Sequence, residues 1–135
     1  MRLMIDANVI LDVLQKREPF YLDSSKVLKM CETNMAEGHL STLTFTNLVY
    51  IMRRELNSEK IEQVLKTLSL ICCFDDLTLS DIINAASIQW DDFEDAVQAT
   101  IAKRINADYI ITRNVKDYRK CSIMAMTPSE FFARI

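Results

Sequence analysis

Short apolar runs alternate along this chain with longer segments in which apolar residues recur every three or four positions. The runs predict strands at residues 3–5, 39–43, 70–74, 109–112 and 123–126. The longer segments predict helices at residues 8–15, 21–35 and 44–56, then four more whose N-caps are Ser58, Ser80, Asp91 or Asp92, and Thr127. Because strands and helices alternate, the pattern predicts a mostly parallel sheet with helices on both faces.

Proline and glycine predict where several of these helices begin or end. Pro19 cannot continue the first helix, and Gly38 follows the second helix as an expected stop. Residues 127–130 (TPSE) have the pattern of a capping box with proline at the first helical position. The last helix should therefore start there.

Length and composition indicate one globular domain over residues 1–135. Half of the residues are hydrophobic, and we find no internal repeat and no linker. No apolar run approaches the roughly 20 residues that span a bilayer, and the run after Arg2 is too short for a signal peptide. We expect a cytoplasmic protein that does not associate with membranes.

The counts of glycine, histidine and cysteine exclude several kinds of site. Gly38 is the only glycine, so the chain has no phosphate-binding loop and no dinucleotide fingerprint. His39 is the only histidine, which excludes any site with two imidazoles. The four cysteines match no zinc spacing and are expected to be small buried hydrophobes in a reducing compartment.

The charge balance argues against strong nonspecific binding of nucleic acid. The chain has 16 Lys and Arg against 19 Asp and Glu, for a net charge of −3. A nucleic-acid role would therefore need a local basic patch, a bound metal or a basic partner protein.

Acidic residues stand where strands end or helices begin. Asp6 follows the first strand, Asp117 follows the fourth, and Asp92 and Asp95 lie three apart at a helix start. The carboxyl ends of parallel strands converge on one crevice, so these acids should meet there. Acids brought together either raise one another's pKa values or bind a divalent cation.

Each acid also has a simpler interpretation. Asp92 fits a helix N-cap, and Asp95 fits the closing residue of a capping box. Asp6 could be a solvated turn residue, and Asp117 a surface acid. Asn8 and Asn114 could orient acids or water molecules, or could be helix caps.

Three motifs together resemble the PIN domain family over nearly the whole chain. They are residues 6–12 (DANVILD), 92–99 (DFEDAVQA) and 111–118 (ITRNVKDY). The resemblance implies a three-layer, Rossmann-like α/β/α fold with about five mostly parallel strands. It also implies a ribonuclease that depends on Mg²⁺ or Mn²⁺, and many small members are toxins inhibited by a small antitoxin protein.

The resemblance assigns roles to individual residues. Asp6, Asp95 and Asp117 would be the catalytic acids and the metal ligands, supported by Asn8, Asn114 and Thr112. Asp92, which shares a helical face with Asp95, is a further candidate metal ligand from its spacing. The family usually has a further glutamate at a helix start, and here Asn47 stands in that position. Arg113 and Lys116 would bind the phosphates of an RNA substrate. We also expect a homodimer.

Two alternatives to a ribonuclease follow from the same residues. A PIN fold weakened by Asn47 could bind RNA or protein without cutting. A phosphatase of the haloacid dehalogenase type also has an aspartate after its first strand, but Asn8 would replace its general acid.

Overall fold

A computed structural model, which describes residues 1–135, contains one sheet of five parallel strands. The strands are β1 (Arg2–Ile5), β2 (Glu37–Ser41), β3 (Cys72–Asp75), β4 (Tyr109–Ile111) and β5 (Met124–Met126), in the order β3-β2-β1-β4-β5. The helices are α1 (Ala7–Leu14), α2 (Tyr21–Glu32), α3 (Thr42–Ile51), α4 (Ser58–Ile71), α5 (Leu79–Ile88), α6 (Phe93–Arg104), the short 3₁₀ helix η1 (Val115–Tyr118) and α7 (Pro128–Arg134).

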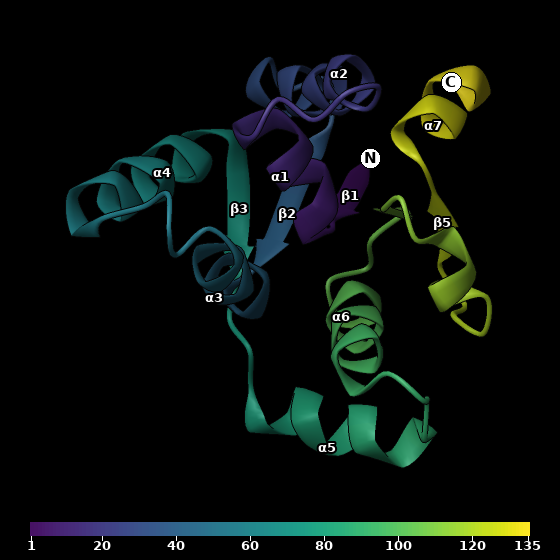
Figure 1. Cartoon of the computed structure of the whole chain (residues 1–135). Helices are drawn as coiled ribbons and strands as arrows, with labels where there is room; N and C mark the ends of the chain where they lie inside the picture. Colours follow the sequence, from purple (N-terminus) through teal and green to yellow (C-terminus); the bar gives the residue numbers. More distant parts are fainter.

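The sheet separates two hydrophobic cores, as a three-layer α/β/α fold requires. Leu3 and Ile5 of β1 pack into a core with residues of α1, α2, α3 and α4, whereas Met4 points to the opposite face and packs against α5 and α6. Figure 1 shows α5 and α6 grouped away from α1, α2 and α4. The fold class predicted from the sequence is confirmed, and all pairings in the sheet are parallel.

The boundaries of two strands, β2 and β3, differ from those that the sequence predicts. β2 covers Glu37–Ser41 instead of 39–43, because the Ser41 hydroxyl accepts the Thr44 amide and starts α3. β3 begins only at Cys72, because α4 continues through the apolar residues 70 and 71. In both places one apolar run crosses a boundary between a helix and a strand.

The predicted helix boundaries at Gly38, Ser58 and Ser80 are also wrong. Helix α2 ends at Glu32, and Gly38 lies within β2. A Cβ atom on Gly38 would lie 2.7 Å from Cys31 Sγ, so glycine here permits close packing of α2 on the sheet. The N-caps of α4 and α5 are Asn57 and Thr78, each of which accepts a backbone N–H in the first turn.

No helix of the structure is long and apolar enough to cross a membrane.

Candidate active site

Asp6 stands at the carboxyl end of the central strand, next to the end of β4. Its backbone N–H donates to Ile111 O at 3.0 Å, which extends the pairing of β1 with β4 by one residue. Its carboxylate accepts the Ala7 N–H at 2.7 Å and thereby caps α1. The other carboxylate oxygen accepts the Thr112 hydroxyl at 2.8 Å. The side chain is therefore fixed by groups from both strand ends.

Thr112 is the centre of a small network that connects the two loops beyond β1 and β4. Its buried hydroxyl oxygen accepts hydrogen bonds from the Asn8 side-chain amide at 3.3 Å and from the Asn114 backbone N–H at 3.0 Å. The Asn8 carbonyl oxygen accepts the Arg113 backbone N–H at 3.2 Å. Asn8 thus orients Thr112, whereas the exposed Asn114 side chain does not cap η1.

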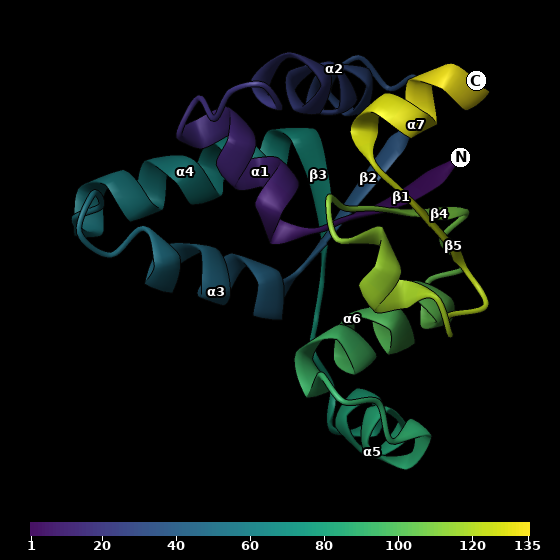
Figure 2. The ribbon, with the colours of Figure 1, turned by 45° about the vertical axis from the view of Figure 1, so that its right-hand side comes forward.

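Helix α6 brings two further acids to the same end of the sheet. Asp92 is its N-cap and accepts the Asp95 N–H at 3.0 Å. One oxygen of Asp95 accepts the hydroxyl of the buried Tyr118 at 3.3 Å. Tyr118 ends η1, the helix that carries the exposed Asp117, so this bond holds α6 against the segment that follows β4 (Figure 2).

The carboxylates lie close enough to influence one another's protonation. Burial, and then the charges of Asp92, Asp6 and Asp117, raise the pKa of Asp95 to about 6. Burial, and to a smaller extent the charge of Asp117, raise the pKa of Asp6 above its ordinary value, although the Thr112 hydrogen bond opposes this. Asp6, Asp95 and Asp117 therefore form one electrostatic cluster built from three separate segments.

Glu94 belongs to this region although the sequence did not single it out. Burial, and then the charges of Asp92 and Asp6, raise the pKa of the Glu94 carboxyl, and a hydrogen bond with the Asn47 side chain lowers it. Asn47 of α3 therefore faces the start of α6. The only feature of the sequence that points to Glu94 is its place next to Asp95 in the first turn of the predicted helix.

Lys116 lines a hollow beside the acids, but Arg113 is held elsewhere. A cavity of about 290 Å³ is lined by Trp90, Asp91, Asp92, Asp95, Lys116, Asp117, Arg119 and Lys120. The Arg113 guanidinium donates to the fully buried Asp12 at 2.9 Å and lies 4.1 Å above the Phe20 ring. Asp12, another acid that the sequence analysis did not single out, also accepts the Ser24 hydroxyl.

The family model described as PIN domain matches residues 2–116, so the chain belongs to the PIN domain family. This match confirms the resemblance seen in the three acidic motifs. No curated protein matches the chain.

Solved structures of similar fold come from bacterial toxin–antitoxin systems. A chain of the DNA-bound VapBC2 complex of Rickettsia felis is 15% identical, with a TM-score of 0.70, and the alignment covers 94% of this chain and 98% of that one. A chain of VapBC-1 from nontypeable Haemophilus influenzae is 17% identical, with a TM-score of 0.70, over 96% and 99%. VapC20 of Mycobacterium tuberculosis, described as a toxin that cleaves the sarcin–ricin loop, is 10% identical, with a TM-score of 0.64, over 80% and 86%.

Proposed function

We propose that this protein is a metal-dependent endoribonuclease that acts as the toxin of a toxin–antitoxin pair. The observation that carries the proposal is the cluster of Asp6, Asp95 and Asp117 at one end of the sheet, in which burial and like charge hold two pKa values above normal. Membership of the PIN domain family and the toxin–antitoxin systems of similar fold support it.

The donor set of this cluster fits a hard divalent cation such as Mg²⁺ or Mn²⁺. Every candidate ligand atom is a carboxylate oxygen, and the charge of the cation would offset the burial and the like charges that raise the pKa values of Asp6 and Asp95. No three acids of this cluster have oxygens that all lie within 4.8 Å of one another. Mg²⁺ does not need three such acids, because it is commonly held by one or two carboxylates and retains several water molecules.

The side chains of the cluster would then divide the work of phosphodiester hydrolysis. A bound Mg²⁺ or Mn²⁺ supplies a more acidic water molecule and positive charge next to the phosphate. Asp6 is positioned as the central ligand, because each of its oxygens accepts only one hydrogen bond. Asp95, with a pKa of about 6, is suited to accept a proton from the attacking water near neutral pH.

The basic residues of the cavity would bind the RNA backbone. Lys116, Arg119 and Lys120 line the same hollow as Asp95 and Asp117, so a phosphate bound there would lie beside the acids. Trp90 in the same wall offers a ring on which a base can stack. Because aspartates line the same hollow, a bound cation would also be needed to offset their charge before a phosphate could enter.

A binding module without nuclease activity is the second candidate, and Asn47 favours it. An amide adds no negative charge to the cluster, and affinity for a hard cation depends on the charge of the ligands. Glu94, which lies beside Asn47, is the acid best placed to supply that charge. Membership of the PIN domain family argues against the phosphatase alternative.

Cleavage of a mixed RNA pool by wild type and Asp6→Asn tests the nuclease proposal. We expect cleavage in Mg²⁺ or Mn²⁺, none in excess EDTA, and none by the variant. An asparagine at position 6 can still cap α1, so the Asp6→Asn variant should keep or raise the free energy of unfolding. The Asn47 side chain cannot replace the lost carboxylate as a metal ligand, so cleavage should still be lost. Cleavage that persists in EDTA would reject the metal mechanism, and RNA binding without cleavage would support the binding module.

Growth assays test the toxin assignment. Expression of the chain alone should arrest bacterial growth, and co-expression of the neighbouring small open reading frame should restore it. Size-exclusion chromatography of the purified chain would test the expected homodimer.

A further inference from the structure

Strands β2 and β3 carry a second group of polar residues, on the face of the sheet that also meets α5 and α6. Side chains alternate along a strand, so Glu37 and His39 point to the same face of β2. The parallel register pairs His39 with Cys73 and Ser41 with Asp75, which places the Cys73 and Asp75 side chains on that face of β3. Four residues able to bind a metal or a proton thus gather on two neighbouring strands.

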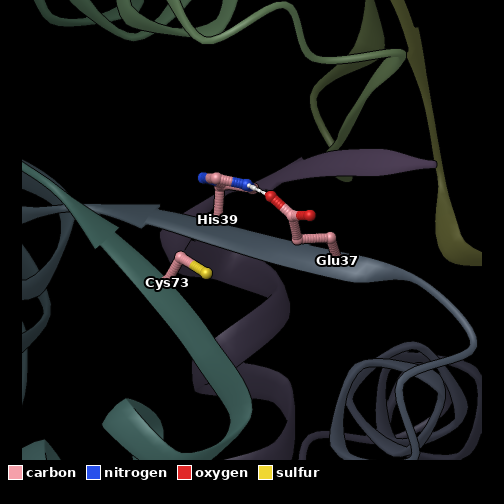
Figure 3. A group of neighbouring side chains, drawn as sticks. All are labelled: Glu37, His39 and Cys73. Carbon is pink, nitrogen blue, oxygen red and sulfur yellow. Dashed lines mark hydrogen bonds and ion pairs between the residues drawn. The ribbon is translucent and has the colours of Figure 1, made fainter.

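Their side chains converge on the single imidazole of the chain. His39 Nδ1 lies 2.8 Å from Asp75 Oδ2, and His39 Nε2 lies 2.6 Å from Glu37 Oε1. Glu37, His39 and Cys73 each offer one ligand atom, and these three atoms lie within 4.8 Å of one another (Figure 3). No other group of three histidine, cysteine or acidic residues in the chain is as compact.

The packing of the sheet does not require polar side chains at these positions. On the same face, the neighbouring strands β1 and β4 place Met4 and Ile110 in the core beneath α6. His39 is 6% exposed, whereas Glu37 and Cys73 are exposed. The imidazole is therefore held in place by protein, while the other two groups remain open to an ion arriving from solvent.

We propose that Glu37, His39 and Cys73 form a binding site for Zn²⁺, separate from the acidic cluster. A thiolate, an imidazole and a carboxylate form the mixed S, N and O set that Zn²⁺ accepts. Mg²⁺ and Ca²⁺ prefer sites made only of oxygen, so this site and the acidic cluster select different metals. Three protein ligands leave the fourth tetrahedral position to water.

Asp75 is placed to orient the imidazole for this role. A metal ion bound at Nε2 would leave the other ring proton on Nδ1, where it can be donated to Asp75. A carboxylate behind a ligating histidine is a common arrangement at zinc sites. On binding, Zn²⁺ would take the place of the proton between Nε2 and Glu37, and this proton and the Cys73 thiol proton would both be released to solvent.

The site joins the edge strand β3 to β2, so its occupancy should stabilise the fold. It does not depend on the proposed nuclease activity, because Asp6, Asp95 and Asp117 follow β1, begin α6 and follow β4. The effect of the metal can therefore be measured on folding and spectra alone.

Co²⁺ and Zn²⁺ titrations of the reduced full chain test the proposal. We expect Co²⁺ to give the absorption of a tetrahedral thiolate complex, and Zn²⁺ to displace it in a ratio of one ion per chain. Free Zn²⁺ at about 100 times its Kd should raise the unfolding midpoint by roughly 10 °C. Cys73→Ser and Glu37→Gln, both at exposed positions, should remove the thiolate band and weaken Zn²⁺ binding, respectively.

Two controls separate this site from other sources of metal binding. Cys121→Ser changes a half-buried cysteine outside the group, and Asp6→Asn changes the acidic cluster; both should leave Zn²⁺ affinity unchanged. Asp75→Asn should weaken Zn²⁺ binding by about 10- to 100-fold while leaving all three ligands in place. Equal Zn²⁺ affinity in wild type and Cys73→Ser, or loss of Zn²⁺ binding in Asp6→Asn, would overturn the proposal and leave His39 as a bridge between two carboxylates.

Discussion

Single residues in the candidate active site show how environment sets the role of a side chain. Asp92 and Asp95 lie within one turn of helix, but Asp92 is exposed and caps the helix, whereas Asp95 is partly buried and has its pKa raised to about 6. The sequence predicted both positions. It could not predict the difference between them, which depends on Tyr118 and Asp6, contributed from elsewhere in the chain.

The raised pKa of Asp95 predicts how activity depends on pH. If Asp95 must be ionised, kcat/KM for RNA cleavage at limiting Mg²⁺ should fall as pH drops through about 6, well above the ordinary range of an aspartate, and saturating Mg²⁺ should move this fall to lower pH. Because the folded-state pKa is raised, this group destabilises the folded protein when ionised, so its contribution to stability should improve from pH 7 down to about pH 4. A cleavage profile from pH 4.5 to 8 and urea unfolding at both limits measure the two effects. A flat rate profile through pH 6 would contradict the role given to Asp95.

The positive charge of Arg113 is expected to stabilise the fold, whereas that of Lys116 is expected to bind the substrate. Arg113→Met would leave the fully buried Asp12 without its partner, at a cost of about 3 kcal/mol in the free energy of unfolding. Lys116→Met changes an exposed residue, so stability should shift by no more than about 0.5 kcal/mol while RNA affinity falls. Urea unfolding and RNA titrations of both variants, run at two salt concentrations, distinguish these outcomes. An unchanged RNA affinity in Lys116→Met would remove it from the substrate site.

At the scale of elements, the sequence predicted all five strands in their order along the chain, but not all of their boundaries. Apolar runs show that a segment is buried, but they do not show where a strand becomes a helix, so residues 70 and 71 were assigned to β3 although they belong to α4. Asn34, with a positive φ of 61°, takes the left-handed position that a glycine often occupies after a helix. The only glycine, Gly38, lies in β2 instead, where it allows close packing against Cys31. The group around His39 depends on strand register, which no local pattern of the sequence reveals.

Asp92 has two effects at the start of α6: it caps the helix, and its charge raises the pKa of Asp95. Asp92→Ala should cost about 1 kcal/mol in the free energy of unfolding, because the Asp95 N–H loses its acceptor, whereas Asp92→Asn should keep most of that stability. Both variants remove a charge that raises the pKa of Asp95, so the acidic limb of the rate profile should move to lower pH in each. If Asp92→Asn abolishes cleavage at every pH, Asp92 is itself a metal ligand and not only a cap.

At the scale of the whole molecule, the fold brings residues that are far apart in the sequence into contact. The Thr112 hydroxyl bonds to Asp6, and the Asn47 side chain meets Glu94 across the gap between α3 and α6. The family motifs made the first contact predictable, because they place both residues after adjoining strands. The second depends on how two helices pack on opposite faces of the sheet, which the motifs do not describe.

Asn47→Glu tests the charge balance of this assembly. A carboxylate at position 47 would face Glu94, so the metal-free variant should unfold at a lower temperature than wild type. The added charge should tighten Mn²⁺ binding, since hard cations bind more strongly as ligand charge rises, and should raise the cleavage rate. Thr46→Glu is the matched control, because it adds the same charge at the neighbouring exposed position of α3. Calorimetric Mn²⁺ titrations of wild type and both variants decide the matter: equal affinities for wild type and Asn47→Glu would mean that Asn47 lies outside the metal's reach, and that the residue has no part in limiting activity.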